Sequence, residues 1–121
     1  MLDISFYPKN GHPPYTVEVS EDSYEWLAKS DFSKIGTSVT RKIQIEGEEE
    51  NLRVLQLGKE NRKKLRNFLL EAISQESDAV LYQLGDSPSK QEYQNATYRL
   101  RKLQELRKCV ENEEYQYLQR V

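Results

Sequence analysis

Hydrophobic and polar residues alternate through most of the first half of the chain. Residues 2–7 and residues 15–19 both show this alternation, which is the period of a half-buried β-strand. The segment between them, residues 8–14, is rich in proline and contains Gly11. Such a segment favours a turn and cannot continue a strand. The pattern therefore predicts a β-hairpin at the start of the chain.

A short helix and a second hairpin are predicted next. Ser20 stands where an N-cap belongs, and two acidic residues follow it at the positive end of the helix dipole. We expect this helix to end near Lys29 and to bury Tyr24, Leu27 and Ala28, with Trp26 off the buried stripe. Alternation returns over residues 37–46, and the aliphatic segment 52–57 predicts a central strand after a polar turn.

The second half of the chain has helical periodicity. Residues 59–74 predict an amphipathic helix, whose apolar positions are Leu65, Phe68, Leu69, Ala72 and Ile73. Residues 76–84 fit a longer helix, a new helix or a short strand. A long helix is predicted over residues 88–112, since Ser87 before Pro88 is typical of a helix start. Its expected core positions are Tyr93, Ala96, Leu100, Leu103 and Val110, with Leu106 at the margin and Cys109 on the opposite side.

These elements together predict an α+β fold. We expect an antiparallel sheet of about four strands, formed by the two hairpins and covered on one face by two or three helices, with a long helix near the C-terminus. The last residues, 115–121, fit either more helix or a terminal strand. The length of 121 residues predicts one domain over residues 1–121. The pairing order of the strands stays open.

Composition indicates a folded, polar protein. Hydrophobic residues make up 36% and charged residues 31% of the chain, and eight tyrosines supply aromatic surface that disordered segments lack. The formal charge of -2 is the sum of -4 over residues 1–57 and +2 over residues 58–121. One cysteine, together with a start that lacks a signal-peptide pattern and the absence of a membrane-spanning run, predicts a cytoplasmic protein with no membrane contact.

Catalytic and cofactor chemistry finds little support. The histidine His12 and the cysteine Cys109 are the only residues of their kinds and lie far apart in the chain, so neither a catalytic pair nor a zinc site is favoured. The glycines are dispersed singly, which excludes the usual phosphate-binding loops. We expect no enzyme activity, no metal and no cofactor.

Candidate binding surfaces are the remaining signal. The acidic turn comprises Glu46, Glu48, Glu49 and Glu50, and the basic helix edge comprises Lys59, Arg62, Lys63 and Arg66. Both sets are most often solvated surface, but both can also hold a partner of opposite charge. Tyr98, Tyr115 and Tyr117 are the tyrosines first expected at an interface.

The sequence therefore predicts a non-enzymatic cytosolic protein that acts by binding another protein. An inhibitor or immunity protein of the bacterial type, which covers the active site of a toxin, is the most concrete version. One alternative is a nucleic-acid-associated regulator that uses the basic helix edge. Another is a homodimeric structural or scaffold protein that pairs through its C-terminal helix.

Overall fold

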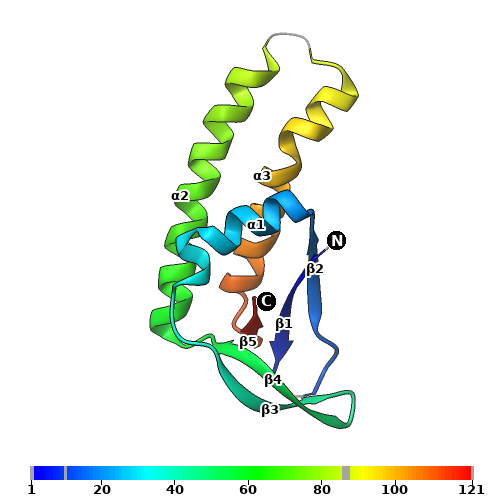
Figure 1. Ribbon diagram of the computed structural model, residues 1–121, viewed down its shortest axis with the longest axis vertical. Coiled ribbons are helices and arrows are strands. Elements are labelled where there is room, and N and C mark those ends of the chain that lie inside the picture. Colours follow the sequence, from blue (N-terminus) through cyan, green and yellow to red (C-terminus); the bar gives the residue numbers. More distant parts are fainter. Residues whose placement is uncertain (1, 10, 86–87, 121) are drawn as a thin grey trace.

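A computed structural model describes residues 2–9, 11–85 and 88–120 (Figure 1). It confirms the α+β class, with an antiparallel sheet and a long helix near the C-terminus. Ser87, the expected start of that helix, lies outside the described residues. The elements are β1 (Leu2–Pro8), β2 (Tyr15–Val19), α1 (Glu21–Lys29), the 3-10 helix η1 (Asp31–Ser33), β3 (Val39–Ile45), β4 (Glu48–Gln56), α2 (Lys59–Leu84), α3 (Lys90–Glu111) and β5 (Tyr115–Gln119).

The last strand of the chain lies in the middle of the sheet. The strand order is β2-β1-β5-β4-β3, so β5 separates the two hairpins and pairs with β1 on one side and with β4 on the other. Leu118 is opposite Phe6 in one pair and opposite Leu55 in the other. The sheet thus has five strands rather than about four, because the ambiguous C-terminal segment forms the strand that joins the hairpins.

Alternation along β1 divides the apolar residues between two clusters. Ile4 and Phe6 point into the main core, which also contains Leu118 of β5 and buried residues of all three helices. Tyr7 points the other way, into a second cluster with Ile43 and Val54. The helices therefore cover one face of the sheet, as expected, and the second cluster lies on the other face.

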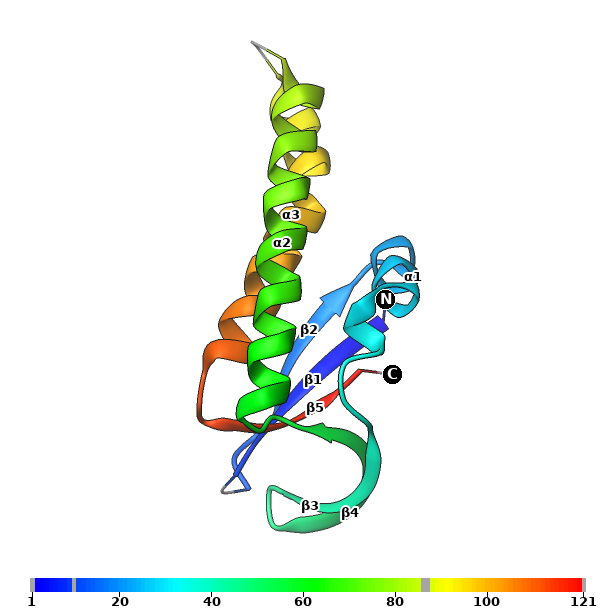
Figure 2. The same ribbon diagram turned by 90° about the vertical axis from the view of Figure 1, so that its left-hand side faces the viewer.

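The β3–β4 hairpin curls toward the loop between β1 and β2 (Figure 2). The backbone N–H of Glu46 in its turn donates to the carbonyl oxygen of Gly11 at 3.1 Å. Within the curl, Ile45, Leu52 and Tyr117 pack around the second cluster as partly buried residues. This curvature gives the hairpin a small core of its own in addition to its pairing with β5.

Helices α2 and α3 form an antiparallel hairpin that projects beyond the sheet (Figures 1 and 2). Helix α2 has 26 residues and includes the ambiguous segment 76–84, so it is about 39 Å long at 1.5 Å per residue. The half near the sheet holds most of the buried positions of both helices. Beyond Ile73 in α2 the buried residue is Val80, and before Leu103 in α3 it is Thr97. The projecting end therefore has little core.

The buried face of α3 differs from the one predicted. Leu106 and Cys109, expected at the margin and on the opposite side, are buried, whereas Tyr93, expected in the core, is exposed. The reason is that the half of α3 near the sheet packs against both the sheet and α2, which widens its buried arc, while Tyr93 lies in the distal half. The helix also begins at Lys90 with Ser89 as its N-cap.

The buried face of α1 is shifted in the same way. Trp26, expected off the buried stripe, packs against the core, and Ala28, expected in the core, is exposed. The Trp26 ring contacts Phe68 of α2 at 6.4 Å between centroids, and the Arg99 guanidinium of α3 lies over it at 5.1 Å. Trp26 is therefore on the packed side of α1, because its large indole contacts both long helices, whereas Ala28 is on the exposed side.

Candidate interaction surfaces

Arg62 of the basic helix edge forms hydrogen bonds with the protein's own backbone. Its guanidinium donates hydrogen bonds of 2.7 to 3.0 Å to carbonyl oxygens that belong to Leu57, Val110, Asn112 and Tyr115. These carbonyls lie after β4, at the end of α3 and at the start of β5. Burial lowers the pKa of Arg62 from its ordinary value. Arg62 therefore stabilises the junction of three elements.

The rest of the basic helix edge borders a depression of mixed charge. Arg66 forms an ion pair with Glu111 at 3.2 Å, and Arg107 bonds the same carboxylate at 2.8 Å. Burial alone would raise the pKa of Glu111, but the hydrogen bonds from Arg107 and Arg66 lower it. Lys59 and Lys63 are exposed. The depression, of about 680 Å³, is lined by Lys59, Arg62, Lys63, Arg66, Glu111, Glu113 and Gln116.

The glutamates of the acidic turn point to opposite faces of the β3–β4 hairpin, because consecutive side chains alternate along β4. Glu46 and Gly47 form the two-residue turn and both have positive φ angles, 50° and 86°, as a type I′ hairpin turn requires. Glu48 and Glu50 then project from one face of the hairpin and Glu49 from the other. All four carboxylates are exposed. The structure thus does not bring them together as one patch.

The tyrosines first expected at an interface make contacts within the chain. The hydroxyl of Tyr98 accepts a 3.0 Å hydrogen bond from the backbone N–H of Ser20, the N-cap of α1. The ring of Tyr115 packs against Phe6 of the main core at 5.7 Å between centroids. Tyr117 packs against the second cluster, under the guanidinium of Arg41. All are half-buried.

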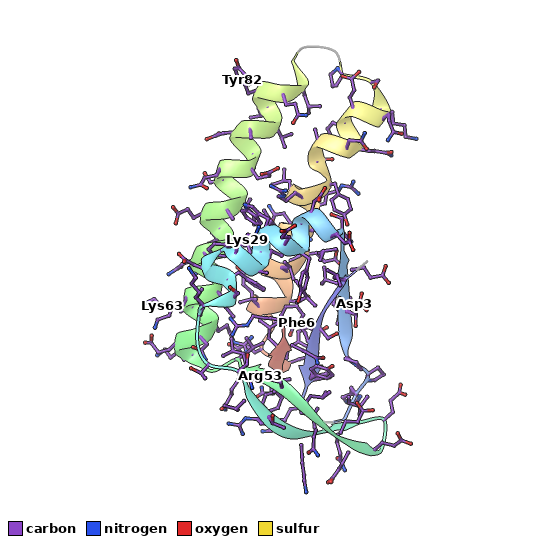
Figure 3. All side chains as sticks on the ribbon, viewed as in Figure 1. Asp3, Phe6, Lys29, Arg53, Lys63 and Tyr82 are labelled. Atoms are coloured by element: carbon purple, nitrogen blue, oxygen red, sulfur yellow. The ribbon has the colours of Figure 1, made fainter. Side chains whose placement is uncertain are left out.

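The most exposed large apolar side chains lie at the projecting end of the helical hairpin. Tyr82 is 93% exposed, Leu81 is 73% exposed and Tyr93 is 55% exposed. Figure 3 shows Tyr82 pointing outward, away from α3. The sequence pattern did not indicate this site, because Tyr93 falls at an expected core position of α3. The available signal was the apolar run Val80–Tyr82, since only part of such a run can face a single neighbouring helix.

Tyr15 and Cys109 sit near one glutamate where the sheet meets α3. The hydroxyl of Tyr15 donates to Oε1 of Glu105 at 2.7 Å, and this bond, aided by burial, raises the pKa of Tyr15 to about 12. Burial, with a smaller effect of the Glu105 charge, raises the pKa of the Cys109 thiol to about 11. A thiol with a raised pKa is a poor nucleophile near neutral pH. Tyr15 and Glu105 therefore stabilise the fold by their hydrogen bond, and Cys109 is not a reactive thiol.

The described ranges contain neither a metal-binding cluster nor a membrane-spanning helix. Within residues 2–9, 11–85 and 88–120, no group of three or more histidine, cysteine or acidic residues could hold a metal ion. No helix in those ranges is long and apolar enough to span a membrane. His12 is exposed in the loop after β1, whereas Cys109 is buried in α3. Comparison with known proteins finds no matching family model, curated protein or solved structure.

Proposed function

We propose that this protein is a non-enzymatic binding module that docks another protein chain with the projecting half of its α2–α3 hairpin. The observation that carries the proposal is the exposure of Leu81, Tyr82 and Tyr93 at this end. Tyrosine is enriched at protein interfaces because it offers a large amphipathic surface at a low cost in side-chain entropy. Leu81 and Tyr82 in the last turn of α2 and Tyr93 in the first turn of α3 are accessible to a partner from several directions.

The small number of buried residues in the projecting end of the α2–α3 hairpin supports the proposal. The distal hairpin buries few residues of its own, and most helical stability in proteins comes from packing of an apolar face. A partner that covers the exposed side chains would supply the missing burial. In contrast, the four glutamates of the acidic turn project from different faces, so the inhibitor version of the function has less support from that turn.

Nucleic-acid binding, the alternative function, has less support from the structure than from the sequence. It needs the basic helix edge to present its charges together. Arg62 is bonded to four backbone carbonyls and Arg66 to Glu111. Acidic Glu111 and Glu113 border the same depression. A protein partner at the apolar end of the hairpin is therefore preferred.

Site-specific photo-crosslinking in the native host tests the proposal. A photoreactive phenylalanine derivative replaces Tyr82 or Tyr93, both exposed, so the fold should tolerate it. We expect discrete covalent adducts with one protein species from both positions. The matched control places the same group at Thr40, an exposed residue of β3, where we expect no such adduct. Equal adduct patterns at all positions, or none at Tyr82 and Tyr93, would overturn the proposal.

A further inference from the structure

Strand β2 is an open edge of the sheet. Among the described residues it pairs only with β1, and Figure 2 shows β2, β1 and β5 side by side in this order. Along an edge strand, every second residue turns its N–H and C=O groups away from the sheet. Over the described part of the chain, no loop or side chain bonds the backbone of residues 15–19. The outer side of β2 therefore offers a row of unpaired donors and acceptors.

The other open edge, β3, is protected against pairing and β2 is not. Strand β3 carries Arg41 and Lys42 and belongs to the curled hairpin, and charge and twist are common means by which an edge strand avoids pairing. Strand β2 pairs with β1 without a bulge and contains neither proline nor lysine. Its sequence, Tyr-Thr-Val-Glu-Val, is rich in residues that favour strands. An added strand therefore fits at β2 better than at β3.

Two carboxylates lie opposite each other at this edge. Glu18 of β2 is directly opposite Asp3 of β1, which is labelled in Figure 3. Both side chains are exposed, and like charges directly opposite each other destabilise a strand pair. None of the ion pairs between described residues includes either carboxylate. A cation placed beside Glu18 would therefore relieve a repulsion that the fold contains.

The alternation of β2 separates its charged contact from its apolar one. Val17 and Val19 point into the main core, so Glu18 points to the face of the sheet that the helices leave open. Tyr15 is on the helical side, where its hydroxyl bonds Glu105 of α3 and its side chain is 42% exposed. An added strand thus places one set of its side chains beside Glu18 and the other set beside the ring of Tyr15.

We propose that β2 binds an extended segment of another protein as a sixth strand of the sheet, with a basic side chain beside Glu18 and an apolar one beside Tyr15. Main-chain hydrogen bonds supply the affinity, and the alternation of basic and apolar residues supplies the specificity. Charge complementarity extends past the strand, because Glu21 and Asp22 follow at the start of α1. Lys102 of α3 lies on the helical side and is already in an ion pair. This surface is separate from the projecting end of the α2–α3 hairpin, so the inference goes beyond the proposed function.

Binding of a synthetic peptide tests the proposal. The probe is a fluorescein-labelled peptide in which lysine alternates with valine, and fluorescence anisotropy at low salt reports its binding to the purified chain. Its control contains the same residues as one block of lysine and one block of valine, which keeps the charge but loses the strand pattern. We expect the alternating peptide to bind and the block peptide to bind about fivefold more weakly.

Charge reversals at two exposed strand positions locate the site. Glu18→Lys should weaken binding of the alternating peptide about fivefold, because an attractive cross-strand pair becomes a repulsive one. The fold should tolerate this change, since it puts opposite charges at the pair with Asp3. Glu49→Lys is the matched control, because Glu49 is an exposed residue of β4 and its reversal should leave binding unaltered.

Amide hydrogen exchange distinguishes an added strand from a contact between surface charges. The peptide should slow the exchange of alternate amides of β2 and leave those of β3 unchanged. Failure of the alternating peptide to bind, equal binding of the block peptide, equal effects of the two charge reversals, or binding without slowed exchange in β2 would each overturn the proposal.

Two other results identify a different partner or a different surface. If exchange in β2 slows with rising protein concentration in the absence of peptide, the edge pairs with a second copy and the proposed partner is wrong. Crosslinks from Tyr82 and Tyr93 test the proposed function separately, because Glu18→Lys should leave those adducts unchanged. Either proposal can therefore fail while the other stands.

Discussion

Arg62 Nη2 donates a hydrogen bond of 2.7 Å to the carbonyl oxygen of Tyr115, which ties the first turn of α2 to the first residue of the central strand β5. Strand β5 comes from the end of the chain and must be inserted between two hairpins that form earlier in the sequence. The guanidinium fixes its entry point from the helical layer. A side chain that the sequence places in a possible binding surface therefore has a central part in the fold.

Replacing Arg62 with lysine should destabilise the protein. An ammonium group lacks the planar fork that reaches four carbonyls at once, so several partly buried acceptors lose their partner. We expect the free energy of unfolding to fall by roughly 2–4 kcal/mol, measured by urea denaturation. Lys64→Met, a change of an exposed neighbour, should alter it by less than about 0.5 kcal/mol. Equal effects of the two changes would contradict the role assigned to Arg62.

Gly36→Ala should also destabilise, for steric reasons. Gly36 has a φ of +67°, and a Cβ there would lie 2.5 Å from Cδ1 of Leu55 and 2.9 Å from Oδ1 of Asn61. We expect a loss of about 3 kcal/mol, which combines the cost of a left-handed alanine with that of overpacking. Gly47→Ala is the control, since its φ is +86° with no atom within 4 Å of the new Cβ. Thermal and urea unfolding should show a smaller loss there, about 1 kcal/mol.

The strands were predictable where one face is buried and the other solvated. Alternation identified β1, β2 and β3 because a period of two follows directly from strand geometry. Strand β5 was ambiguous because its short sequence, with Tyr115, Tyr117 and Leu118, fits helical and strand spacings alike. Its central position depends on pairing with β1 and β4, which are remote in sequence, so local pattern could not specify it.

The candidate surfaces were predictable in composition but not in accessibility. The sequence shows that Arg62 lies on a basic helix edge, but the carbonyls that occupy it come from both halves of the chain. Similarly, the helical wheel of α3 shows an apolar stripe but not how far the sheet extends along it. Tyr93 was therefore expected in the core but is exposed, because it lies in the first turn of α3, in the half of the hairpin that projects past the sheet.

Cys109 should resist thiol reagents until the protein unfolds. It is buried, and burial raises the pKa of its thiol to about 11, so little thiolate forms near neutral pH and access is blocked. Labelling with an aromatic disulfide reagent should be slow in buffer and should follow the unfolding transition in urea. A cysteine introduced by Gln75→Cys at an exposed position should react at once in both conditions. Rapid labelling of Cys109 in the folded wild type would contradict its burial.

The hydrogen bond from Tyr15 to Glu105 should make stability depend on pH in the alkaline range. The pKa of Tyr15 is raised to about 12, above the value of about 10 for an unfolded tyrosine. The contribution is therefore complete below about pH 10 and is lost as the pH rises through 12. Urea denaturation at a series of pH values should show a constant difference between wild type and Tyr15→Phe near neutral pH, and a shrinking difference above pH 10.

Glu105→Gln separates the hydrogen bond, which is the main cause of the raised pKa of Tyr15, from the smaller effect of the Glu105 charge. The amide oxygen of glutamine can still accept from Tyr15, but the negative charge that opposes tyrosinate formation is gone. We expect ultraviolet titration of tyrosinate to show the high-pH component, assigned by its absence in Tyr15→Phe, moving to lower pH in Glu105→Gln. If wild type and Glu105→Gln titrate identically, the charge of Glu105 does not contribute to the raised pKa of Tyr15, and the 2.7 Å hydrogen bond with burial accounts for it.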